Sequence, residues 1–172
     1  KQPDNLREIK NEDDNNEKNS KILDNALNRE NFQRNFLSRG LEKFSDDDLI
    51  LINDLDEIPN LENFKYKNKV TLFKQKMFYY KLNLAYPNFF WIGSKACKKK
   101  HLLNPQWLRN IKSKKYPLWR IDTLFSKKKY IDISYVENGG WHFSNVKNAK
   151  DLDKKMKTFL HHLEYEESGM GV

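Results

Sequence analysis

The sequence predicts an α/β domain in which a mixed sheet is flanked by helices, with a further helix at the C-terminal end. Residues 20–41 and 149–165 carry apolar side chains at helical spacing. The segment between them is rich in β-branched and aromatic residues, which favour strands. Within that segment, a short apolar run at residues 48–52 is followed by a cluster of carboxylates. Because open α/β sheets bind ligands where strands end, we expect a site after this run.

Composition sets the outer limits on fold and function. The 172 residues suffice for one domain with its own core, and we assign residues 1–20 to a polar lead-in or loop and residues 21–172 to the domain. The 32 Lys and Arg residues against 24 Asp and Glu residues give a net charge of +8, which suits phosphate-bearing partners, an anionic membrane face or good solubility. Cys97 is the single cysteine, so an internal disulfide is excluded and a structural role is expected.

The two helical segments have recognisable limits. The lead-in lacks apolar periodicity and is expected to be a solvated loop. From Ser20 the apolar positions predict one or two helices, and Gly40 is a plausible stop. From Ala149 the helical spacing resumes as far as Tyr165, which predicts the C-terminal helix.

The run at residues 48–52 has the continuous apolar pattern of a strand that is buried on both faces. Pro59 restricts Ile58 to extended geometry and interrupts the strand, so the carboxylates before it are expected on a turn. Within that turn, Leu55 is expected to point into the core.

Several further strands are predicted. A turn at Tyr86-Pro87-Asn88 is expected between two of them, and residues 137–144 are expected to form a glycine turn carrying aromatic and polar groups. The segments with strand character are Val70–Phe73, Met77–Tyr80, Phe89–Ile92 and Tyr130–Val136.

Three carboxylates, Asp54, Asp56 and Glu57, fall within four residues and repel one another unless a cation or hydrogen-bond donors compensate them. A divalent cation, Mn²⁺ or Mg²⁺, would resolve the conflict, because hard cations combine one or two carboxylates with phosphate oxygens. A bare Asp-x-Asp is more often a solvated turn. Here the preceding apolar strand, Glu57 and the following Ile58-Pro59 favour the metal site.

The segment Gly139–Ser144 is the second group of residues with chemical potential. Its paired glycines permit a tight backbone, Trp141 offers a face for stacking, and His142 offers a nitrogen for a metal. A histidine taken alone is more often a structural residue.

Together these segments resemble glycosyltransferase family 17, which includes the β-1,4-mannosyl-glycoprotein 4-β-N-acetylglucosaminyltransferases. The resemblance covers about residues 25–165. It lies in Arg29-Glu30 and Gln33-Arg34-Asn35, the run at 48–52 leading to Asp-Leu-Asp-Glu-Ile-Pro at 54–59, Gly-Trp-His-Phe-Ser at 140–144, and the helix from Lys155 to His161.

The resemblance implies a GT-A-like fold, a UDP-sugar donor that is UDP-N-acetylglucosamine in known members, a glycan acceptor, a divalent cation and inversion at the anomeric carbon. It also implies that Asp54 and Asp56 meet cation and nucleotide and that His142 completes the metal shell. The family's first nucleotide-binding unit has no counterpart here, so we expect an N-terminally truncated domain. Glu164 also stands three residues after His161, where the family tends to place an acidic residue two after its histidine.

Glu57 and Glu137 are the candidate general bases that would deprotonate the acceptor hydroxyl while the metal neutralises the diphosphate. Each also has a structural interpretation. Glu57 would orient the acidic cluster, and Glu137 would be an ordinary carboxylate beside a turn.

The substrate-binding candidates are Asn53, Arg34, Arg120 and Trp141. Either arginine would neutralise a diphosphate or bind a core carboxylate. Arg34 follows Glu30 by one helical turn, so an intrahelical ion pair is at least as well supported. Trp141 would stack on an acceptor sugar or simply pack.

Two alternatives stay open. The Lys-rich segments at 98–100, 112–116 and 127–129 suit an RNA-binding module, but no RNA-binding signature accompanies them, so nucleic acid is not expected as a partner. A truncated transferase would instead be an inactive sugar-binding or membrane-surface-binding piece. The expected location is cytoplasmic, compatible with peripheral membrane association, or the Golgi lumen in a eukaryote.

Overall fold

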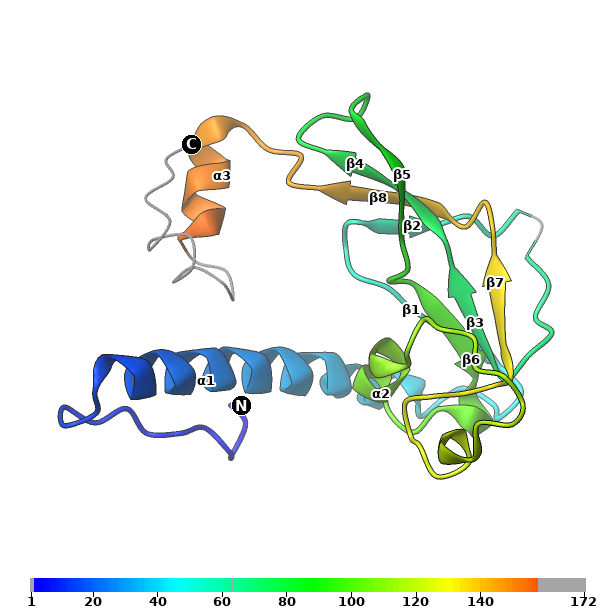
Figure 1. The fold of residues 1–172 in the computed structure, drawn as a ribbon, viewed down its shortest axis with the longest axis horizontal. Coiled ribbons are helices and arrows are strands. Elements are labelled where there is room, and N and C mark those ends of the chain that lie inside the picture. The colour runs from blue at the N-terminus through cyan, green and yellow to red at the C-terminus, as the bar shows by residue number, and fades with distance from the viewer. Residues whose placement is uncertain (1, 63, 158–172) are drawn as a thin grey trace. The chain divides into compact units, whose positions relative to one another are not determined.

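The computed structural model describes residues 2–62 and 64–157, which form two compact units. One unit contains the described residues up to Leu37 and from Lys147 onward, and the other is Ser38–Val146. Figure 1 labels the elements of both. Each unit is described by itself below.

The first unit is helical. Helix α1 (Asn15–Phe36) begins several residues before the Ser20 start that we expected, because Asp14 caps it by accepting a hydrogen bond from the Glu17 amide at 2.8 Å. The residues before it are held by Asn25, which exchanges two 2.7 Å hydrogen bonds with the backbone of Arg7. Helix α3 (Ala149–Met156) confirms the start of the C-terminal helix. Its predicted continuation, including His161 and Glu164, lies outside the described residues.

The second unit holds all the strands of the described residues. After the 3₁₀ helix η1 (Leu37–Leu41), the elements are β1 (Leu49–Ile52), β2 (Glu57–Pro59), β3 (Val70–Phe73), β4 (Gln75–Tyr79), β5 (Ala85–Trp91), β6 (Lys95–Lys98), η2 (Lys99–His101), α2 (Pro105–Asn110), η3 (Ile121–Thr123), β7 (Ile133–Val136) and β8 (Gly140–Ser144).

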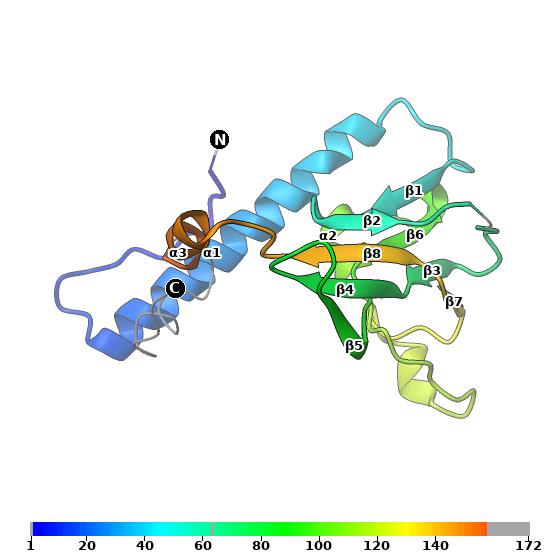
Figure 2. The same cartoon turned by 90° about the horizontal axis from the view of Figure 1, so that it is seen from above.

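These strands form two four-stranded mixed sheets, ordered β1-β6-β3-β7 and β2-β8-β4-β5. The β3–β7 and β4–β8 pairs are parallel and the other pairs are antiparallel. Figure 2 shows β2, β8, β4 and β5 lying side by side. The predicted mixed α/β class is thus confirmed, and the GT-A-like fold stays a prediction. No helix within the described ranges is both long and apolar enough to cross a bilayer.

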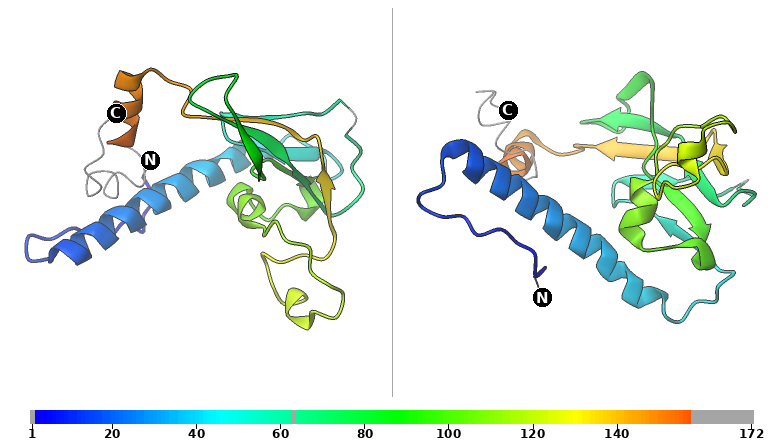
Figure 3. Two further views of the ribbon diagram at one scale, coloured as in Figure 1. Left: turned by 45° about the horizontal axis from the view of Figure 1, so that its top comes forward. Right: turned by 60° about the horizontal axis from the view of Figure 1, so that its bottom comes forward.

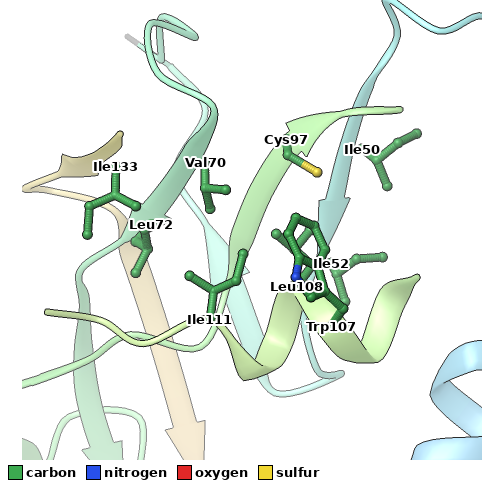
Figure 4. Packing of buried hydrophobic residues seen from close by; sticks show 9 residues of the cluster. All are labelled: Ile50, Ile52, Val70, Leu72, Cys97, Trp107, Leu108, Ile111 and Ile133. Atoms are coloured by element: carbon green, nitrogen blue, oxygen red, sulfur yellow. The ribbon is translucent and has the colours of Figure 1, made fainter. Parts of the chain in front are cut away.

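The core of the second unit lies between the first sheet and α2. Trp107 and Leu108 of α2 pack with Ile111 against apolar side chains of the sheet, as Figure 4 shows. Cys97 lies fully buried within this cluster, and burial raises the pKa of its thiol to about 12. Its predicted structural role agrees with this position.

Strand β1 occupies the predicted position, but the expectation that both its faces are buried was wrong. Ile50 and Ile52 are buried, whereas Leu49 is exposed and Leu51 is half-buried. The reason is that β1 is an edge strand that pairs with β6 and contributes one face to the core.

Two predicted turns are strands. Tyr86-Pro87-Asn88 lies inside β5, an edge strand on which a proline needs no ladder hydrogen bond. The reversal before β5 occurs instead near Tyr80, which has a φ of 63°. The predicted glycine turn is largely β8, and it pairs with both β2 and β4.

Candidate active site around the acidic turn

The acidic residues lie on the turn that joins β1 to β2. The Glu57 amide donates to the Asp54 carbonyl at 3.1 Å, which closes a four-residue turn. Asn53 fixes this turn, because its Nδ2 donates to the carbonyls of Asp54 and Glu57 at 3.0 and 3.1 Å. Leu55 is fully exposed on the outside of the turn, so its predicted place in the core was wrong.

Glu57 is the buried centre of this site, and its side chain has no exposed surface. Arg109 donates to both of its carboxylate oxygens at 2.9 to 3.0 Å. Trp91 Nε1 donates at 2.6 Å, and Ser94 Oγ and the Asp54 amide each donate at 3.1 Å. Burial by itself would raise the pKa of Glu57, but the hydrogen bonds from Arg109 and Trp91 outweigh it and lower that pKa.

Arg109 is the residue of the candidate site that sequence reasoning missed. It comes from α2, and its second guanidinium nitrogen also donates to Asp54 at 2.6 Å. The repulsion between Asp54 and Glu57, which we expected a metal ion to relieve, is therefore compensated by an arginine. The sequence offers one general signal for such a residue, namely that a buried carboxylate needs a counter-charge, but this signal does not say which arginine supplies it.

Lys95 holds the end of α2 that carries Arg109. It is buried, and its Nζ donates at 2.6 Å to the carbonyls of both Arg109 and Ile111. An ammonium group at the C-terminal carbonyls of a helix is favourable. Burial, followed by the nearby Arg109 charge, nevertheless lowers the pKa of Lys95 to about 8.

This pKa gives a testable dependence of stability on pH. Between pH 8 and 10.5 the unfolded chain keeps the Lys95 proton and the folded chain releases it, so the free energy of unfolding should rise with pH. The expected Lys95 contribution is about 3 kcal/mol. Urea unfolding of the wild type and of Lys95→Met across this range isolates it, because other titrating groups are shared. Parallel pH profiles for the two proteins would contradict the assignment.

Asp56 and His142 form the second half of the site. Asp56 Oδ2 lies 3.4 Å from His142 Nε2. His142 stands opposite Glu57 in the β2–β8 register, and Trp91 stacks on its ring at a centroid distance of 4.8 Å and an interplanar angle of 20°. The Phe143 amide also donates to the Asp56 carbonyl at 2.9 Å, which ties the turn to β8.

Buried polar atoms without a hydrogen-bond partner gather on this face. Within the described residues they are His142 Nδ1 and both amide atoms of Gln75. In the register Gln75 stands opposite Trp91, and Met77, two residues on, stands opposite His142. Alternate residues of a strand share a face, so Gln75 lies on the same side of the sheet as His142. Such atoms call for a polar partner.

Several of the predicted substrate-binding residues have other partners or another orientation. Arg34 belongs to the helical unit and pairs with Glu30 at 2.9 Å, as the intrahelical alternative predicts. Arg120 binds Asp122 through two hydrogen bonds of 2.6 and 2.8 Å in the loop before β7. Trp141 adjoins His142 on β8, so it faces the opposite side of the sheet.

Glu137 is mostly exposed, and Lys74 Nζ lies 2.8 and 2.9 Å from its two oxygens. The expected metal set is not assembled as one cluster either. Across residues 2–62 and 64–157, no three His, Cys, Asp or Glu side chains converge in the manner of a metal centre. Asp56 and His142 come together, whereas Asp54 turns its carboxylate to Arg109.

The Lys-rich segment at 98–100 is largely engaged within the fold. Lys98 and Lys100 both donate to Asp47, at 2.9 and 2.8 Å, and Lys99 Nζ donates to the Phe44 carbonyl. These contacts hold η2 beside the residues that precede β1. The segment therefore gives little support to an RNA-binding face.

An aromatic groove of about 780 Å³ adjoins the site along β4 and β5. Trp91 belongs to both, because it lines the groove and also stacks on His142. Ring contacts link Tyr79 to Tyr86 and Tyr86 to Phe89, with centroids 6.2 and 5.7 Å apart. The lining residues are Met77, Tyr79, Tyr80, Leu84, Ala85, Tyr86, Pro87, Phe89 and Trp91.

Comparison with known proteins gave no match to a family model, to a curated protein or to a solved structure.

Proposed function

We propose that the protein is a metal-dependent inverting glycosyltransferase that moves a sugar from a UDP-sugar donor to a hydroxyl of a glycan. The observation that carries the proposal is the Asp56–His142 pair, in which a turn carboxylate lies 3.4 Å from a buried histidine of β8 beside an aromatic groove. The resemblance of the two motifs to glycosyltransferase family 17 supports UDP-N-acetylglucosamine as the donor.

The residues present fit a divalent cation. Asp56 supplies a carboxylate oxygen and His142 an imidazole nitrogen, and their 3.4 Å separation suits two ligands of one ion with bonds of about 2.1 Å. Mn²⁺ or Mg²⁺ bound by few protein groups takes the remaining ligands from water and substrate phosphate oxygens. When bound, the cation supplies Lewis-acid stabilisation to the diphosphate leaving group. Asp54 lies two residues from Asp56 and is oriented by Arg109.

The two candidate bases differ in what their surroundings allow. Glu57 is fully enclosed and accepts hydrogen bonds from Arg109, Trp91 and Ser94, so it suits a positioning role that fixes the turn. Glu137 presents a carboxylate that a hydroxyl can reach, so it is the base we retain. In the reaction the acceptor oxygen bonds to the anomeric carbon, the bond to the diphosphate breaks, and the acceptor proton passes to the carboxylate.

The aromatic groove suits a sugar-binding surface. Flat ring faces contact the C–H faces of sugars, and the Tyr79, Tyr80 and Tyr86 hydroxyls offer hydrogen bonds to sugar hydroxyls. Trp91 connects this groove to His142, so a sugar in the groove would lie next to the proposed cation. Glycan and cation would thereby be neighbours, as group transfer requires.

Calorimetry tests the metal assignment. Titration of the wild type with Mn²⁺ in the presence of UDP is expected to show binding, and Asp56→Asn is expected to weaken it about tenfold or more. Asp47→Asn is the matched control, because it removes a carboxylate that binds lysines rather than His142. Unchanged Mn²⁺ affinity in Asp56→Asn, or equal losses in both variants, would refute the site.

A further inference from the structure

Large apolar side chains gather on the loop that leads from α2 to β7, here called the 112–128 loop. Five of them fall within eight residues of this loop, and 69% to 86% of their surface is open to solvent. Single exposed apolar residues are ordinary, but five within one short segment point to an interaction surface. In the left view of Figure 3 the yellow-green loop extends away from the strands. The five residues are Leu118, Trp119, Ile121, Leu124 and Phe125.

The 112–128 loop is closed at its base by hydrogen bonds. The Lys112 amide donates to the Lys128 carbonyl at 2.8 Å, and Trp107 Nε1 donates to the Lys127 carbonyl at 2.6 Å. Nearer the tip, the buried Thr123 donates through its hydroxyl to the Arg120 carbonyl at 2.6 Å. The loop therefore has a built base and an internal support, so its exposed apolar side chains are presented by ordered structure.

Basic residues stand on both stems of the loop. Residues 112–129 contain six lysines and Arg120 against the single acidic residue Asp122, a net charge of +6. Lys129 and Arg120 both bind Asp122, with shortest contacts of 3.0 and 2.6 Å, so the one acidic group is neutralised locally. An apolar tip between two basic stems is the arrangement of a segment that enters a charged interface.

We propose that the 112–128 loop inserts into an anionic lipid surface. Its Trp, Phe, Leu and Ile side chains would enter the boundary between headgroups and acyl chains, while the stem lysines meet lipid phosphates. Charge complementarity selects this partner. A second copy of the chain would bring the same positive charge, and a nucleic acid would leave the apolar tip uncovered. The inference does not depend on the glycosyltransferase proposal.

Vesicle flotation tests the proposal. The wild type is expected to bind vesicles of phosphatidylcholine that contain about one-third phosphatidylglycerol, and to bind pure phosphatidylcholine only weakly. Replacing Trp119 and Phe125 together by serine should reduce binding at least about tenfold. Replacing Lys127 and Lys128 by glutamine should reduce the preference for phosphatidylglycerol by about tenfold. Leu82→Ser is the matched control, because Leu82 is exposed on a different connection, and it should bind like the wild type.

Fluorescence gives a second measurement that does not depend on affinity. Cys97 is buried and should not react, so a polarity-sensitive thiol label is expected to attach only to a cysteine introduced on the surface. Label carried by Phe125→Cys should shift to the blue on anionic vesicles and be quenched by brominated acyl chains, whereas label carried by Leu82→Cys should not. Absence of wild-type flotation, equal flotation of the Trp119 and Phe125 double variant, or unquenched label at position 125 would overturn the proposal. The proposal would also be overturned if the loop substitutions abolished RNA binding or dimer formation and left vesicle binding unchanged.

Discussion

Replacing Arg109 by methionine is expected to cost about 3 to 5 kcal/mol of unfolding free energy, because it leaves Glu57 charged and enclosed without its counter-charge. The Arg109 guanidinium donates to both oxygens of Glu57 and to Asp54, and the Glu57 side chain has no exposed surface. Urea denaturation at neutral pH, followed by circular dichroism, measures the change. Arg120→Met is the matched control, since the Arg120–Asp122 pair is exposed to solvent and should contribute little to stability.

A double variant separates the buried charge from lost packing. If the buried charge is responsible, adding Glu57→Gln to Arg109→Met should restore at least half of the lost stability, because no ionised carboxylate then remains enclosed. Equal stability of the single and double variants would show that Arg109 acts mainly through its aliphatic contacts. A loss below about 1 kcal/mol for Arg109→Met would mean that Glu57 is not buried as described.

The strands were predictable where the pattern is local. Residues 70–73 form β3 as predicted, and the run at 48–52 yields β1, since short apolar and β-branched runs have few alternatives to a sheet. The errors arose where the burial or the limits of a strand depend on its neighbours in the sheet. Whether β1 is buried on one face or two depends on its edge position, and Pro87 is tolerated in β5 because that strand also lies at an edge. Strand order is a property of residues far apart in the chain.

In the candidate site, too, the local features could be predicted from the sequence pattern and the contacts between distant residues could not. The turn from Asp54 to Glu57 was predictable because Pro59 and the carboxylates act within a few residues. Pairing of Asp56 with His142 was predicted through a motif resemblance, and the β2–β8 register brings the two residues together. The partner of Glu57 was not predictable, because Arg109 lies 52 residues further on and no spacing marks it. We therefore expected a metal ion to compensate the Asp54 and Glu57 charges, which Arg109 compensates in the structure.

Replacing Gly93 by alanine is expected to disrupt the site and to cost about 4 kcal/mol or more of unfolding free energy. A Cβ atom at Gly93 would overlap the Glu57 carboxylate and the Trp91 indole nitrogen. The Glu57 carboxylate cannot move aside cheaply, because Arg109 and Ser94 also hold it. Thermal and urea unfolding measure the loss.

The same substitution should also weaken Mn²⁺ binding, since Trp91 stacks on His142 and would be displaced with the carboxylate. Gly40→Ala is the matched control. A Cβ atom at Gly40 meets nothing within 4 Å, so this variant should unfold and bind Mn²⁺ like the wild type. Equal stability of the two alanine variants would contradict the close packing of Gly93 against Glu57. A displaced Trp91 cannot keep His142 in place, so the destabilised Gly93→Ala should bind Mn²⁺ weakly. Normal Mn²⁺ binding by this variant would show that the buried Glu57 carboxylate does not support the proposed cation site.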